Sequence, residues 1–215
     1  MKTLCIYGAS GLGKETLEIA KSMKKWNNIL FVDDNLFGNK INEVQVVSFN
    51  YVVENYDAKA TEFVIALGEP YLRQTLHEKV VDAGLELSTL FHRSNNVPGL
   101  SSFSEGSIVH MNVSVACDLY LGKSVYINKA VVLGHDVEIS DFSVISPNVT
   151  IGGNVTIGKH CYIGSGAIIK NDISIGNGSI VGMGAVVLEN VPEHVVMVGN
   201  PARFIRKNHN KRVFN

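Results

Sequence analysis

The sequence contains little of what marks an extracellular or membrane protein. It has only three cysteines, Cys5, Cys117 and Cys161, and an odd number in apolar surroundings favours reduced thiols over a disulfide framework. No stretch approaches the roughly 18 consecutive apolar residues that a transmembrane helix needs. The first residues lack the charged, apolar and cleavage-site order of a secretion signal. We therefore expect a cytoplasmic protein without a membrane span.

An excess of charge of one sign is also missing. Lys and Arg together number 19 and Asp and Glu number 20, which gives a net charge of −1 over 215 residues. Without a long basic run, nucleic acid is not expected as the main partner. Only the end of the chain is basic, which is typical either of a solvated chain end or of a phosphate site at that end of the fold. The basic residues there are Arg203, Arg206, Lys207, Lys211 and Arg212.

A six-residue repeat dominates the chain from Val97 to Val191. Every sixth residue from Val97 is apolar, and the residue four positions later is nearly always small or β-branched. A fixed period indicates a repeat architecture, and six fits neither a helix nor a simple amphipathic strand. We interpret the repeat as short strands and turns wound into a solenoid, with both series directed toward its axis.

The first 90 residues follow a different pattern. A strand-like run, a glycine turn, a helical pattern and a second strand-like run follow one another at residues 3–7, 8–13, 12–23 and 29–32. This is the opening of a Rossmann-type unit, whose glycines and helix N-terminus suit a phosphate or sugar. Asp33 and Asp34, about twenty positions on, suit ribose or sugar hydroxyls. A later helix is expected to bury Leu72, Leu76, Val80 and Ala83.

The glycine turn leaves alternatives open. Its spacing is G-x-x-G-x-G instead of G-x-G-x-x-G, and Glu15 stands where a P-loop needs Ser or Thr, which disfavours triphosphate hydrolysis. A nicotinamide dehydrogenase is disfavoured because the unit is short. A turn that serves only close packing remains possible.

His135 is the main candidate for chemistry within the repeat. It follows Gly134 at an outward-facing position, and Asp136 comes directly after it. A carboxylate beside an imidazole fixes its tautomer and raises its basicity, as a general base near neutral pH requires. Asn128, one side of the solenoid away, could also reach the site. A lone surface histidine is usually idle, so an inert His135 stays an alternative.

A metal site is the rival interpretation, because His110, His135 and His160 are evenly spaced by 25 residues. If 18 residues form one coil, a step of 25 climbs one coil and turns onto the next face. The three side chains would then lie on three faces, whereas zinc needs ligands that converge at about 2.0–2.3 Å. We therefore expect no metal site within one chain.

The whole chain resembles the hexapeptide-repeat bacterial sugar acyltransferases, which include sialic acid O-acetyltransferases and UDP-bacillosamine-type N-acetyltransferases. The matching segments are Tyr7–Gly13, Val32–Asp34, Ala66–Gly68, Gly134–Asp136, the 97–191 repeat and Val198–Arg203. The resemblance implies an α/β Rossmann-like half domain at residues 1–90 that binds a nucleotide sugar. It implies a left-handed parallel β-helix with three hexads per coil at residues 91–215, which carries the acyltransferase site.

The resemblance also assigns roles to residues. His135 would be the general base, supported by Asp136 with Asn128 close by, and the Gly153 amide would stabilise the oxyanion. Acetyl-CoA would lie between subunits of a homotrimer and contact Gly153, Ser165, Met183 and Arg203. The nucleotide sugar would contact Ser10, Gly11, Leu12, Asp33, Asp34 and Gly68.

Two positions depart from the family pattern. Many relatives have a histidine where this chain has Leu12, and some have a second histidine near acetyl-CoA where it has Val144. The expected activity is transfer of an acetyl group from acetyl-CoA to the amine of a nucleotide-linked amino sugar, for a surface glycan. O-acetylation of the sialic acid type and a non-catalytic nucleotide-sugar-binding scaffold remain alternatives.

Overall fold

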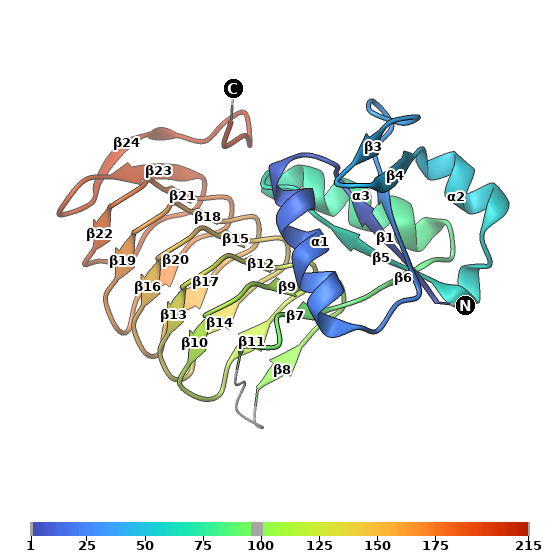
Figure 1. The fold of residues 1–215 in the computed structure, drawn as a ribbon. Coiled ribbons are helices and arrows are strands. Elements are labelled where there is room, and N and C mark those ends of the chain that lie inside the picture. Colours follow the sequence, from blue (N-terminus) through green and yellow to red (C-terminus); the bar gives the residue numbers. More distant parts are fainter. Residues whose placement is uncertain (1, 96–100, 215) are drawn as a thin grey trace.

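A computed structural model describes residues 2–95 and 101–214, in two parts: an α/β domain and a three-sided β-helix (Figure 1). Val97, the first residue of the repeat series, lies outside the described residues. The α/β domain comprises β1 Thr3–Tyr7, α1 Gly11–Met23, β2 Asn28–Val32, β3 Lys40–Ile41, β4 Val44–Val47, α2 Phe49–Asn55, a 3-10 turn Ala58–Ala60, β5 Thr61–Ile65, α3 Pro70–Asp82 and β6 Glu86–Leu87.

The α/β domain is built on a sheet with strand order β3-β4-β2-β1-β5-β6, in which only the β3–β4 pair is antiparallel. All five residues of β1 are buried, as expected for a central parallel strand covered on both faces. The chain passes from β1 to β2 on one side and later to β5 on the other. Ligands of such sheets bind in the crevice at this switch point, where the loops after β1 and β5 meet.

The buried face of α3 differs from the prediction. Leu72 is 45% exposed, whereas Arg73 and His77 are buried together with Val80. These polar side chains face the β-helix, where the Ser124 carbonyl accepts hydrogen bonds from Arg73 and the Ser124 hydroxyl is hydrogen-bonded to Nδ1 of His77. Apolar periodicity therefore missed the contact surface, because this face meets polar backbone instead of a hydrophobic core.

The β-helix consists of two-residue strands that recur every six residues, followed by a terminal hairpin. Their bounds are β7 Leu90–Phe91, β8 Ser102–Phe103, β9 Ile108–Val109, β10 Ser114–Val115, β11 Tyr120–Leu121, β12 Tyr126–Ile127, β13 Val132–Leu133, β14 Glu138–Ile139, β15 Val144–Ile145, β16 Thr150–Ile151, β17 Thr156–Ile157, β18 Tyr162–Ile163, β19 Ile168–Ile169, β20 Ser174–Ile175, β21 Ile180–Val181, β22 Val186–Val187, β23 Val195–Val198 and β24 Arg203–Lys207. Because β7 already pairs with β9, the first strand of the β-helix begins at Leu90.

Three sheets form the sides of the β-helix, and their strands are parallel except for the terminal β24. Residues 18 apart are paired, as in Ile127 with Ile145 and Ile145 with Ile163. This confirms the predicted coil of three hexads. Face A contains β7, β9, β12, β15, β18, β21, β23 and β24; face B contains β10, β13, β16, β19 and β22; face C contains β8, β11, β14, β17 and β20. The chain turns from A to B at edge AB, then at edges BC and CA.

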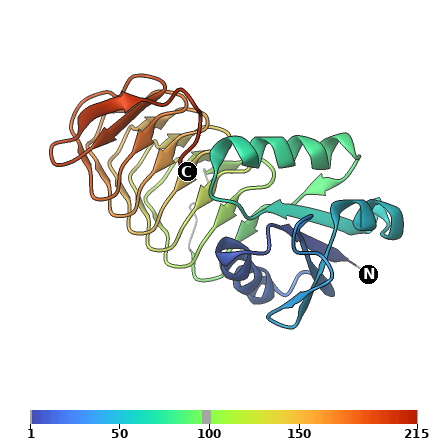
Figure 2. The same ribbon diagram turned by 90° about the horizontal axis from the view of Figure 1, so that it is seen from above.

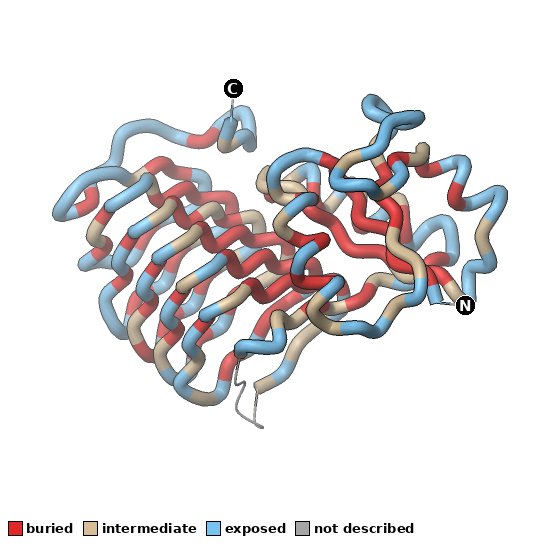
Figure 3. The backbone as a smooth tube through the Cα atoms, in the orientation of Figure 1, coloured by how far each residue is buried: buried red, intermediate tan, exposed pale blue. Residues whose placement is uncertain are grey.

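Both predicted inward series fill the axis of the β-helix. Ile127, Val131, Ile145 and Val149 are fully buried and belong to one continuous apolar cluster. Figure 3 shows this buried layer running through every coil. Each buried Ile or Val contributes about 1.5–3 kcal/mol relative to exposure, so the stacked coils form a substantial core.

Face A packs against the α/β domain, as the views in Figures 1 and 2 agree. The outward residues Ile108, Tyr126 and Val144 of this face are buried in one cluster with Ile6 and Leu17 of the α/β domain. Val144, 4% exposed, therefore lies in the core between the domains of its own chain. The position where some relatives have a histidine near acetyl-CoA is therefore covered by the α/β domain in this chain.

Arg73 is the polar centre of the domain junction. It is fully buried and donates to the carbonyl oxygens of Ile65 and Leu67 at 2.7 and 2.8 Å and to that of Ser124 at 2.6–2.9 Å. Burial lowers its pKa to about 10, so the guanidinium remains protonated at neutral pH. Ser124 lies on edge CA, so one side chain ties the loop after β5 to the β-helix.

Among the described residues, no helix is both long and apolar enough to cross a membrane.

Candidate functional site

His135 and Asp136 form a hydrogen-bonded pair on edge BC, directly after β13. The imidazole Nδ1 lies 2.7 Å from a carboxylate oxygen of Asp136, and the side chains are 56% and 60% exposed. Asp136 has a φ of 55°, a left-handed conformation that Asp tolerates better than most residues. With Nδ1 donating to the carboxylate, Nε2 keeps its lone pair free to accept a proton, so the arrangement suits a general base.

Gly153 lies one coil above His135 on the same edge. A β-carbon at this position would overlap the His135 ring, so the imidazole rests directly against the glycine backbone. Among the described residues, no acceptor receives the Gly153 amide N–H. Such a free donor beside a base is what stabilisation of an oxyanion requires. The structure thus brings His135, Asp136 and Gly153 together.

Substitution of Gly153 by alanine is expected to lower kcat at least about tenfold, because a displacement of 1 Å at a catalytic group can cost about 100-fold. The added methyl group pushes the imidazole away from its position against the backbone. Gly158→Ala is the matched control, since its β-carbon would crowd Asn177 on another edge instead of His135. Steady-state rates of thiol release from acetyl-CoA measure the effect; equal losses in the two variants would contradict it.

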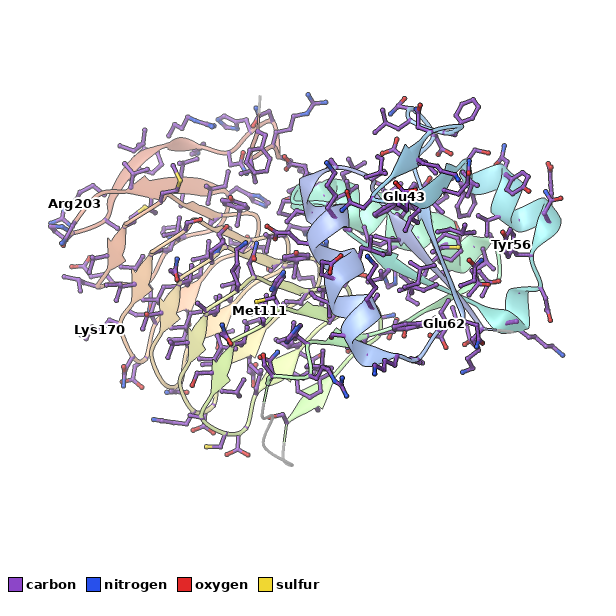
Figure 4. All side chains as sticks on the ribbon, viewed as in Figure 1. Glu43, Tyr56, Glu62, Met111, Lys170 and Arg203 are labelled. Atoms are coloured by element: carbon purple, nitrogen blue, oxygen red, sulfur yellow. The ribbon has the colours of Figure 1, made fainter. Side chains whose placement is uncertain are left out.

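The other residues predicted for acetyl transfer lie on edge AB of the same chain. Asn128 is largely buried, and its side-chain oxygen accepts the Lys129 amide at 2.8 Å. Ser165 and Met183 stack one coil apart, and Met183 is 79% exposed. Figure 4 shows Met111 on this edge, beside α1, and Lys170 on edge BC. Within one chain, face B therefore separates Asn128, Ser165 and Met183 from His135.

Arg203 begins β24, in the terminal hairpin. It is exposed, and its guanidinium donates to the Ala202 carbonyl at 3.2 Å. Figure 4 places Arg203 at the end of the β-helix farthest from the α/β domain. The basic residues of β24 thus lie at that end of the fold, as predicted, whereas the residues that follow β24 turn away from it.

Asp33 and Asp34 lie at the carboxyl end of β2 and line a cavity of about 210 Å³. Asp33 accepts the amides of Ala9 and Asn35 at 3.3 and 3.0 Å. The cavity is lined by Tyr7, Gly8, Asp33, Asp34, Asn35, Leu67, Leu72 and Leu76. The two acidic residues therefore border the crevice that the fold predicts, beside the glycine turn.

Asp34 is already bonded within the domain. It accepts hydrogen bonds from the Phe49 amide at 2.8 Å, the Tyr7 hydroxyl at 2.7 Å and Lys79 at 3.0 Å. Burial alone would raise the pKa of Asp34, but these hydrogen bonds and the charge of Lys79 hold it below its ordinary value. The Asp34 side chain thus links β1, α2 and α3 within the α/β domain.

The glycine turn after β1 meets the loop after β5. Ser10 precedes α1 without a side-chain capping bond, and a β-carbon at Gly11 would meet no atom within 4 Å. A β-carbon at Gly68 would lie 3.2 Å from the Leu12 side chain and 3.5 Å from the Phe214 ring. Phe214, which the sequence interpretation did not include, therefore borders this loop. No local sequence pattern indicates that the C-terminal residues pack against the loop after β5.

The three evenly spaced histidines lie on three different edges, as predicted. His110 on edge AB lies 3.8 Å from Glu15, and His160 on edge CA stacks on Tyr71 with ring centroids 4.3 Å apart. Burial lowers the pKa of both His110 and His160. In the described part of the chain, no three His, Cys, Asp or Glu side chains are grouped to hold a metal ion.

Two family descriptions match this chain. The PglD N-terminal domain matches residues 3–80, and the bacterial transferase hexapeptide (six repeats) matches residues 136–171 and 154–189. A curated relative, GDP-perosamine N-acetyltransferase of Escherichia coli O157:H7, is 32% identical over 139 residues, which are 62% of this chain and 62% of that protein. The match thus spans less than two thirds of the relative's length.

Solved structures match over nearly the whole chain. WeeI from Acinetobacter baumannii AYE is 30% identical with a TM-score of 0.88, and the match covers 95% of this chain and 100% of that one. PerB from Caulobacter crescentus, solved in complex with CoA and GDP-perosamine, is 26% identical with a TM-score of 0.89, covering 96% and 98%.

The fold and the exposed His–Asp pair define a class, the hexapeptide-repeat transferases with an N-terminal α/β domain. More particularly, the chain belongs to the hexapeptide-repeat sugar acetyltransferase family with a PglD-type N-terminal domain.

Proposed function

We propose that the protein transfers the acetyl group of acetyl-CoA to the amine of a nucleotide-linked amino sugar. The observation that carries this proposal is the exposed His135–Asp136 pair against the free amide of Gly153. The solved relative with CoA and GDP-perosamine, and the curated relative named as an N-acetyltransferase, support the same cosubstrate and acceptor class. A cytoplasmic place in surface-glycan synthesis belongs to the proposal.

The geometry supports a direct transfer. The sugar amine attacks the thioester carbonyl carbon while Nε2 of His135 takes its proton, and Asp136 stabilises the imidazolium that forms. The carbonyl oxygen becomes an oxyanion that accepts the Gly153 N–H. The carbon–sulfur bond then breaks, and the proton on His135 passes to the departing thiolate, which restores the neutral base.

A homotrimer would complete the site. Edge AB carries Asn128, Ser165 and Met183, and edge BC carries His135, so the two sets meet only where edge AB of one copy faces edge BC of another. Val132 and Ile168 on face B, between these edges, are 44% and 47% exposed. A contact between two different surfaces of neighbouring copies gives a closed ring when the rotation from one copy to the next divides a full turn evenly. With three copies, edge AB of each copy would face edge BC of the next.

The experiment that tests this function is thiol release from acetyl-CoA in the presence of UDP-, GDP- and dTDP-linked amino sugars and free sialic acids. We expect release with a nucleotide-linked amino sugar and a product that carries an amide-linked acetyl group. Release with sialic acid alone would replace the proposal by O-acetylation. No release with any acceptor would favour a nucleotide-sugar-binding scaffold.

A further inference from the structure

The crevice after β1 and β2 poses an electrostatic problem for an anionic ligand. Two carboxylates, Asp33 and Asp34, border it, and the cation bonded there, Lys79, is held by Asp34 at 3.0 Å. A nucleoside diphosphate sugar carries negative charge on its phosphates, which needs cations or free amides nearby. The glycine turn and the N-terminus of α1 offer amides, but any unpaired positive charge has to reach this crevice from another part of the chain.

The segment after β24 supplies it. Asn208 is almost fully buried, and its side chain donates to the Gly178 carbonyl at 2.9 Å, so the chain is anchored on edge CA. From there it runs back to the α/β domain, where Glu69 accepts the amides of Val213 and Phe214 at 3.0 and 3.2 Å. Figures 1 and 2 both show the end of the chain at the domain junction.

This returning segment closes a second cavity, of about 460 Å³, against α3. Leu72 lines both this cavity and the one at Asp33, so the two adjoin. The new wall contributes Lys211, Arg212 and the Phe214 ring. Lys211 lies 5.3 Å above the Tyr71 ring, and among the described residues neither it nor Arg212 forms an ion pair.

We propose that residues 210–214 form one wall of the nucleotide-sugar site, where Lys211 and Arg212 bind the diphosphate and Phe214 packs against the nucleoside. This rests on the proposed function for its ligand class. It reassigns these two cations. The functional interpretation of the sequence placed them in a phosphate site at the end of the solenoid, whereas the fold returns them to the cavity beside α3, which Glu69 and Leu72 also line.

Isothermal titration of the full-length protein with UDP, GDP and dTDP, and separately with CoA, tests the assignment. The double variant Lys211→Ala/Arg212→Ala is expected to raise the Kd of the nucleoside diphosphate that the wild type binds at least about tenfold, because charge-assisted contacts are lost. Its Kd for CoA should not change. Lys40→Ala/Lys59→Ala removes the same charge from exposed sites and should change neither Kd.

The Phe214→Ala variant tests whether the Phe214 ring contributes to nucleotide binding or instead blocks the site. As part of the wall, its loss should weaken nucleoside diphosphate binding several-fold; tighter binding would overturn the proposal. Unchanged binding in the Lys211/Arg212 double variant, or a higher Kd for CoA, would overturn it and leave the proposed function standing. Failure of the wild type to bind any of the three nucleotides would instead remove the acceptor on which both proposals rest.

Discussion

Replacement of His135 by alanine is expected to lower kcat at least about 100-fold, the lower end of what general-base catalysis contributes. The imidazole is 56% exposed and bonded to Asp136, so its removal takes no side chain out of the core. The fold and the Kd for CoA should therefore stay at wild-type values. Thiol release from acetyl-CoA with the best acceptor measures kcat, and turnover equal to the wild type would exclude His135 as the base.

Two controls sharpen this experiment. His209→Ala removes an exposed histidine after β24 and should leave kcat unchanged. Asp136→Asn keeps a hydrogen-bonding side chain but removes the charge that stabilises the imidazolium, so we expect a smaller loss of kcat than for His135→Ala. Both variants and His135→Ala should retain the mass of three chains in solution, and a monomeric mass for the wild type would contradict the composite site.

Replacement of Arg73 by methionine is expected to lower the free energy of unfolding by at least about 3 kcal/mol, because each buried acceptor left without a donor costs about 1–3 kcal/mol. Three carbonyl oxygens, those of Ile65, Leu67 and Ser124, would lose their donor. Methionine fills part of the space without supplying hydrogen bonds. Urea denaturation, followed by circular dichroism, measures the change.

The comparison variants for Arg73 separate charge from geometry. Arg73→Lys keeps the charge but cannot present the guanidinium fork to three carbonyls, so we expect an intermediate loss of stability. Arg93→Met removes an exposed arginine and should stay within about 0.5 kcal/mol of the wild type. A similarly small change for Arg73→Met would show that the junction is held by apolar contacts alone.

Much of the β-helix was predictable because its coils pack on their nearest neighbours. The six-residue period predicted both inward series. The family resemblance added three hexads per coil, and hence the pairing of residues 18 apart, which the register from Ile127 to Ile145 to Ile163 confirms. The same arithmetic separated the three histidines onto three edges and left His135 beside Asp136. Neighbours in sequence are neighbours in space here, so the pattern was sufficient.

Predictions that depended on contacts between the two domains were less successful. Val144, at the position where some relatives have a histidine, lies in the core between the domains, while α3 buries Arg73 and His77 in place of Leu72. Periodicity indicates that a face is buried but not which surface covers it. The resemblance grouped Asn128 with His135, but the chain places them on different edges, so their proposed contact needs a second copy.

By itself, then, the sequence determined the six-residue period, the residues that face the axis and the pairing of His135 with Asp136. These features depend on contacts within a few residues or one coil along the chain. Only the tertiary structure decided that Arg73 joins α3 to Ser124, 51 residues away, and that Glu69 holds Val213, 144 residues away. Such contacts depend on how two separately patterned domains dock, which no local repeat encodes.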